Sequence, residues 1–144
     1  MKTGYTAQTS VTIHATASMV WDGLTKPELI KKYFFGTDTE TDWKKGSPIT
    51  FIGVWEGKPY RDKGVVMDIV PGKFVSYSYW SSFSGKPDVP ENYAIVRYEL
   101  SGIDNEVTVT VTQEGLDTDQ QREHTISNWN MVLGNLKKLL EERR

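Results

Sequence analysis

The side chains that could perform acid–base or metal chemistry are few, and their spacing fits no catalytic constellation. The 144-residue sequence has no cysteine and two histidines, His14 and His124. Neither histidine has a partner at the His-x-x-x-His or Glu-x-x-His spacing that presents metal ligands on one helix face. Gly-x-Ser-x-Gly, a phosphate loop and Gly-x-Gly-x-x-Gly are absent from the sequence. We therefore expect no catalytic residue, no metal and no cofactor.

A second chemical candidate is a group of carboxylates. Asp38, Glu40 and Asp42 alternate along the sequence, so in an extended strand they would share one face. Such a face could hold a weakly bound cation or lie in solvent. Solvent is the interpretation we favour, because three like charges on one face favour hydration.

The aromatic side chains carry the strongest signal. Five Trp, seven Tyr and five Phe make up 12% of the chain, and large rings with polar tips suit a broad sheet face or the wall of a cavity. A packed core is the alternative for most of them. The residues that could line one cavity are Tyr33, Phe34, Trp43, Phe51, Trp55, Tyr77, Tyr79, Trp80 and Trp129.

Positioning these rings requires a sheet and a long helix. We expect strands over residues 5–14, 49–55, 60–70, 74–80, 93–100 and 106–113. Two short helices follow the first strand, one that begins near residue 16 and one over residues 28–34, and a long helix covers residues 118–142. Asp68 suggests that Val65, Met67 and Ile69 point inward. The phase of 74–80 is open: either Tyr77 and Tyr79 face inward, or Phe74, Ser76, Ser78 and Trp80 do.

The last helix has an apolar stripe of Ile126, Trp129, Leu133, Leu136 and Leu140, widened by Met131, Val132 and Leu139. Strands clustered between helices predict an α+β fold, a curved antiparallel sheet wrapped around this helix, in one domain over residues 1–144. One helix fills a curved sheet unevenly, so we expect a pocket between them. Its predicted lining is Tyr33, Phe34, Phe51, Met67, Tyr77, Tyr79, Trp129 and Leu133, with Tyr33 and Phe34 at the mouth.

Charge and hydropathy narrow the partners. The net charge of −2 comes from scattered charges of both signs, which argues against a nucleic-acid partner. The N-terminus lacks an apolar signal region, and no apolar run approaches the roughly 20 residues that span a bilayer. We expect a cytoplasmic protein without membrane insertion.

Four segments, in order, resemble the family of the activator of heat-shock protein 90 ATPase, C-terminal domain, within the START-like, birch-pollen-allergen-like superfamily. They are residues 20–28 (VWDGLTKPE), 64–71 (GVVMDIVP), 112–115 (TQEG) and 129–141 (WNMVLGNLKKLLE). Two positions depart from the pattern: Asn128 stands where the family often has Gly, and Tyr33-Phe34-Phe35 where it often has Trp. The resemblance implies the helix-grip fold.

Three functions follow as hypotheses. The first is non-enzymatic binding of a small apolar or amphipathic molecule between sheet and helix. The second, implied by the resemblance, is a stress-response or co-chaperone interaction with a chaperone, which predicts a solid core and an exposed apolar patch. Eukaryotic activators add an N-terminal domain that 144 residues leave no room for, so direct ATPase stimulation is not expected. The third is a polyketide-cyclase-like enzyme, which requires a buried polar cluster such as Arg97 with Tyr79; alternation places Arg97 outside.

Overall fold

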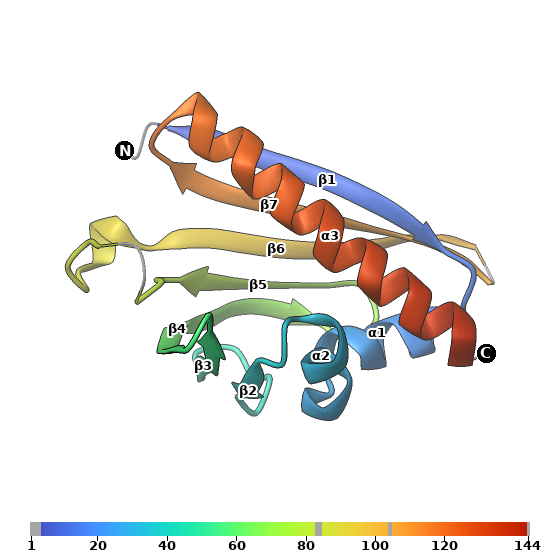
Figure 1. Ribbon diagram of the computed structural model, residues 1–144. Coiled ribbons are helices and arrows are strands. Elements are labelled where there is room, and N and C mark those ends of the chain that lie inside the picture. The colour runs from blue at the N-terminus through green and yellow to red at the C-terminus, as the bar shows by residue number, and fades with distance from the viewer. Residues whose placement is uncertain (1–3, 83–84, 104, 144) are drawn as a thin grey trace.

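A seven-stranded antiparallel sheet and a long C-terminal helix dominate the computed structural model, which describes residues 4–82, 85–103 and 105–143 (Figure 1). The strands lie in the order β1-β7-β6-β5-β4-β3-β2. The α+β helix-grip prediction is confirmed, and β2 lies in the segment where Asp38 and Glu40 alternate as in a candidate strand. The elements are β1 (Tyr5–Ile13), α1 (Ala17–Thr25), α2 (Pro27–Tyr33), β2 (Asp38–Glu40), β3 (Pro48–Trp55), β4 (Lys58–Val70), β5 (Phe74–Tyr79), η1 (Pro90–Asn92), β6 (Ala94–Ile103), β7 (Glu106–Leu116) and α3 (Asp119–Arg143).

The helices begin where the sequence supplies capping groups. The Thr16 hydroxyl accepts a hydrogen bond from the Met19 amide at 3.1 Å, and Pro27 occupies the first turn of α2. Thr118 caps α3 by accepting from the Gln121 amide at 3.0 Å. No helix in the described part of the chain has the length and apolar character needed to cross a membrane.

One face of the sheet carries the helices α1, α2 and α3. In Figure 1, α3 runs diagonally across this face, and α1 and α2 lie beside its C-terminal half. A Cβ added at Gly23 would lie 3.0 Å from Leu136 Cδ1, so the glycine lets α1 approach α3 closely. The core lies in this layer, where Trp129, Leu133 and Leu136 face the sheet.

Most of the predicted stripe of α3 is confirmed, although Ile126 at its N-terminal end is only half-buried. Leu136 and Leu140 are buried together with Trp129, Val132 and Leu133, whereas Met131 is 53% exposed. Met131 lies about 100° around the helix from Val132, which is enough to take it off the buried face.

A β-bulge in β4 corrects the predicted inward residues of that strand. Val66 pairs with Tyr77 and Asp68 with Ser76, so Met67 is an extra residue on β4. Val66 is buried, while Val65 and Met67 are 43% and 42% exposed. Beyond the bulge the phase changes and Ile69 packs against the core. The prediction was therefore right for Ile69 and wrong for Val65 and Met67.

Side chains of α3 cover the outer edge of β1. Lys137 Nζ donates to the Thr12 carbonyl at 2.9 Å, and Glu141 Oε2 accepts from the His14 amide at 2.9 Å. Lys137 and Glu141 also pair with each other at 2.7 Å. The backbone groups that an edge strand leaves unpaired are thus partly satisfied within the chain.

Candidate functional site

The inner face of β3, β5 and β6 presents a continuous cluster of aromatic rings. On β5, Tyr77 and Tyr79 point inward, which settles the open phase of this strand. The Phe51 ring lies 5.6 Å from that of Tyr77 and 5.9 Å from that of Tyr79, and Tyr77 lies 6.3 Å from Tyr98. Seven of the eight predicted lining residues belong to this core or pack against it: Tyr33, Phe34, Phe51, Tyr77, Tyr79, Trp129 and Leu133. Met67 does not, because it lies at the exposed bulge.

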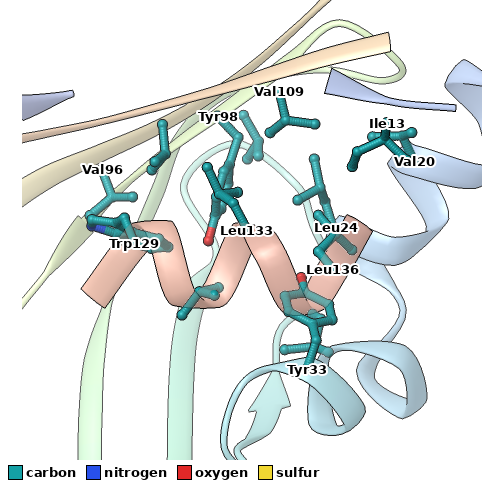
Figure 2. Close-up of a cluster of buried hydrophobic side chains, with 14 of the residues drawn as sticks. Ile13, Val20, Leu24, Tyr33, Val96, Tyr98, Val109, Trp129, Leu133 and Leu136 are labelled. Atoms are coloured by element: carbon teal, nitrogen blue, oxygen red, sulfur yellow. The ribbon is translucent and has the colours of Figure 1, made fainter. Parts of the chain in front are cut away.

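Trp129 connects the sheet to the short helices. Its ring meets Tyr98 edge-on at 5.6 Å and Phe34 edge-on at 5.9 Å, both favourable geometries for aromatic pairs. Its indole Nε1 donates to Gln113 Oε1 at 2.9 Å, so the polar atom of this buried side chain is satisfied. Figure 2 shows Trp129 and Leu133 on α3 facing Val96 and Tyr98 of the sheet.

These rings lie where the sequence predicted the wall of a pocket. Trp129, Tyr98, Tyr77 and Phe51 form an unbroken series of ring contacts beneath α3. Two surface hollows lie elsewhere: one of about 110 Å³ is lined by Thr6, Tyr93 and Glu114 among others, and one of about 310 Å³ by Glu40, Asp42 and Ser47 among others. Neither is lined by a predicted pocket residue.

A carboxylate lies among the rings, which the sequence pattern did not predict. Asp62 on β4 is 7% exposed. Its Oδ2 accepts from the Tyr79 hydroxyl at 2.6 Å, and its Oδ1 accepts from the Ser82 amide at 2.8 Å and the Ser82 hydroxyl at 3.1 Å. The buried polar cluster is thus built on Asp62 and Tyr79.

Four tyrosines keep their phenols protonated in this environment. Burial raises the pKa of the Tyr33, Tyr77, Tyr79 and Tyr98 hydroxyls above the usual value, because the phenolate would lose its hydration. Figure 2 shows the hydroxyl groups of Tyr33 and Tyr98 directed into the layer between α2, α3 and the sheet. The interior therefore offers neutral hydroxyl groups inside an apolar wall.

The ring series continues to the surface at the end of α2. Phe34 contacts Phe35 at 6.0 Å, and Phe35 contacts Trp55 at 5.5 Å, both near edge-on. Phe35 is 41% and Trp55 49% exposed, and we call this pair the Phe35–Trp55 patch. Phe35 has φ +54°, a conformation that side chains other than Gly, Asn and Asp adopt at a cost. The backbone at the end of α2 thus presents this ring against Trp55.

Other candidates from the sequence lie on the outer face or in solvent. Arg97 stacks on the Phe74 ring at 4.1 Å and pairs with Glu99 at 3.0 Å on the outer face, as alternation predicted. Asp38, Glu40 and Asp42 are exposed, and so are His14 and His124. The described residues contain no group of three His, Cys, Asp or Glu side chains that could hold a metal.

The fold and its interior define a START-like helix-grip protein, in which a long C-terminal helix closes over the concave face of an antiparallel sheet. Residues 14–141 match the family described as "Activator of Hsp90 ATPase homolog 1-like protein". The chain belongs to this family, because the match covers most of its length. No curated protein sequence matches the chain.

Solved structures share the whole architecture. A protein from Cytophaga hutchinsonii is 40% identical, with a TM-score of 0.85 over 99% of this chain and 98% of that one. A Mesorhizobium loti protein is 17% identical, with a TM-score of 0.81 over 97% and 99% of the two chains. The Aha1 dimer of Colwellia psychrerythraea is 21% identical, with a TM-score of 0.74 over 95% and 96%. The last two likenesses show the fold alone.

Proposed function

We propose that this chain is a non-enzymatic interaction domain that binds a chaperone of the Hsp90 class through the Phe35–Trp55 patch. The observation that carries the proposal is a series of aromatic rings in mutual contact beneath α3 that ends in two large rings exposed at the surface. This combination matches the co-chaperone hypothesis, which requires a solid core and an exposed apolar patch. The family description supports the class of partner.

The chemistry around the patch favours a partner surface that combines an apolar pocket with acidic groups. Exposed aromatic side chains contribute most when they enter such a pocket and are fully desolvated. Lys58 pairs directly with Trp55 across the β3–β4 hairpin, and Lys32 lies on the last turn of α2 before Phe35. Both lysines are exposed, so their charge is available at the rim of the patch. Binding through it is expected to weaken as salt concentration rises.

The test is isothermal titration calorimetry, in which the chain is titrated into the Hsp90-class chaperone of the same organism. Trp55→Ala is expected to weaken binding about tenfold or more, because the central aromatic side chain of an interface typically contributes at this level. Phe35→Asn is expected to act in the same direction, and asparagine tolerates the positive φ at this position.

Ile103→Ala is the matched control for these variants. Ile103 is the most exposed large apolar side chain of the described residues, at 76%, and it lies on the β6–β7 hairpin. Its variant is expected to bind like the wild type. The absence of chaperone binding by the wild type, or equal binding by all three variants, would contradict the proposal.

A second candidate function is binding of a small amphipathic molecule at the inner aromatic face. It is favoured by the neutral tyrosine hydroxyls and the Asp62 carboxylate beneath half-buried Phe51 and Tyr79. A few polar groups in an apolar wall are the usual composition of such a site. The ligand would enter at the α2 end, where Phe34 is half-buried, by displacing that ring.

This second function predicts a thermal shift that depends on Phe34. Fatty acids, sterols and aromatic polyketides are screened against the wild type, and a binder at 100 times its Kd should stabilise the fold by about 2.7 kcal/mol. Phe34→Ala should enlarge the site. The ligand should therefore raise the melting temperature of this variant, measured against the same variant without ligand, by more than it raises that of the wild type. If no compound shifts the wild type or Phe34→Ala, this candidate is removed and the chaperone proposal is unaffected.

A further inference from the structure

We infer that the inner face around Asp62 is a binding site for a protonated organic amine. The inference rests on the second proposed function, binding of a small molecule at the inner aromatic face, and names the polar group that its ligand carries. Three observations on the described residues lead to it: a buried carboxylate that faces no cationic side chain, aromatic rings beside it, and a buried hydroxyl without a partner on the same face.

Asp62 lacks the counter-charge that buried carboxylates normally have. Within the described ranges it forms hydrogen bonds to Tyr79 and Ser82 and no ion pair. Its neighbours Arg61 and Lys63 are exposed, since alternation along β4 directs them to the opposite face, and Lys63 pairs with Asp88. Buried acidic side chains are usually paired with a cation. The hydrogen bonds leave room for a further donor at Oδ2, which accepts one of them.

The surroundings of this carboxylate suit an organic cation. Phe51 lies directly opposite Asp62 in the β3–β4 register, and the Phe51 and Tyr79 rings lie 5.9 Å apart at 67°. The negative face of an aromatic ring attracts a nearby ammonium group, most strongly where water is excluded. A metal ion would require several oxygen ligands, and no acidic cluster in the described part of the chain provides them.

Thr39 supplies the third observation. It is 4% exposed, and its Oγ1 is buried without a hydrogen-bond partner among the residues that the structure describes. Thr39 pairs with Phe51, and Phe51 pairs with Asp62, so the three residues form one row across β2, β3 and β4 on the inner face. A buried hydroxyl without a partner is costly in the absence of a ligand. Neighbouring strands lie about 4.8 Å apart, so Thr39 and Asp62 are roughly 10 Å apart across this row, and a ligand whose ammonium group meets Asp62 would reach Thr39 through a second polar group.

The ligand class that fits this row is a primary amine attached to a flat or aliphatic apolar group. The charged end would displace no protein cation, and the apolar part would pack on Phe51 and Tyr79, which are both half-buried. Carboxylates and phosphates are disfavoured, because Asp62 would repel them at short range. Neutral isosteres would keep the apolar contacts and lose the charge-assisted hydrogen bond.

The experiment compares 2-phenylethylamine with its neutral isostere 2-phenylethanol by NMR titration of the wild-type chain. The amine is expected to bind at least tenfold more tightly and to shift the Ser82 amide signal, whose N–H donates to Asp62. Asp62→Asn should abolish the preference for the amine. Asp68→Asn, an exposed aspartate on the same strand, should retain it.

Thr39→Val provides a second variant of matched shape. Neither probe carries a second polar group, so this variant should retain the preference for the amine and serves as a further control for Asp62→Asn. Should Asp62→Asn fail to fold, the wild-type comparison and the Ser82 shift still decide the matter. Equal binding of amine and alcohol overturns the inference and leaves ligand binding at the inner face standing. If neither probe binds, or if Asp62→Asn keeps the preference, the amine site is rejected.

Discussion

Replacement of Gly64 by alanine is expected to lower the free energy of unfolding by about 3 kcal/mol or more, at the upper end of the cost of overpacking. A Cβ added at Gly64 would lie 1.6 Å from the carbonyl oxygen of Ser78 on β5. The obstacle is backbone, so no change of rotamer can remove it. Strands β4 and β5 would have to separate at the point where Tyr79 and Asp62 meet. Urea unfolding followed by circular dichroism measures the effect.

Gly134→Ala is the control for this prediction. Gly134 lies within α3, and an added Cβ would meet nothing within 4 Å. Alanine is the better helix former by about 1 kcal/mol, so this variant should be more stable than the wild type. If Gly64→Ala unfolds at the same urea concentration as the wild type, the close approach of β4 and β5 is incorrect.

The second large effect is expected at Trp129. Trp129→Ala should cost about 3–5 kcal/mol, because it leaves a cavity between Phe34, Tyr98 and Leu133 and removes the partner of Gln113. Trp129→Phe should cost less, since it retains a ring against Tyr98 and loses the indole N–H. The same unfolding measurement, combined with a scan of thermal melting, orders the three proteins.

Met131→Ala tests whether the effect belongs to the buried face of α3. Met131 is half-exposed and two residues from Trp129, so its truncation should change the free energy of unfolding by less than about 0.5 kcal/mol. Comparable losses for the two positions would show that α3 does not direct Trp129 toward the sheet and Met131 toward solvent. A small loss for Trp129→Ala alone would show that the interior around Phe34 and Tyr98 is loosely filled.

Strong periodicity made most of the architecture predictable from sequence. In β7, Val107, Val109 and Val111 alternate with threonines, and all three valines are buried. In α3, Leu133, Leu136 and Leu140 recur at helical spacing and are buried as expected. Such patterns depend on a single element and a single face, so no knowledge of the rest of the chain is needed. The three-residue strand β2 has only the alternation of Asp38, Thr39 and Glu40, which is too short to define its bounds.

The largest error has one physical source, the bulge at Met67. If the side chains of β4 alternated without interruption, an exposed Asp68 would put Val65 and Met67 on the inner face of the sheet and Asp62 on the outer face. The extra residue reverses the phase, so the segment before the bulge follows the opposite rule. A bulge is set by the pairing of two strands, and the sequence of one strand contains little sign of it. This is why the buried carboxylate was not among the predicted site residues.

The pocket was a different kind of prediction. The sequence patterns correctly placed Phe51, Tyr77 and Tyr79 on the inner face of the sheet and Trp129 on the face of α3 that meets it. Whether these rings enclose a space or fill it depends on their rotamers and on the position of α2. Tyr98 was accessible to the same reasoning, because it alternates with Val96 on β6. The exposed ring of Phe35 was not, since it depends on a left-handed backbone residue after α2.

The contacts that Lys137 and Glu141 make with the β1 margin also limit how copies of this protein can assemble. A strand of a neighbouring molecule could pair with β1 at this edge only after two contacts made by charged side chains were broken. At the opposite margin, β2 offers three residues, too short a template for stable cross-molecular pairing. Self-association through main-chain hydrogen bonding is therefore discouraged at both borders, and any dimer of this chain should form through side-chain surfaces.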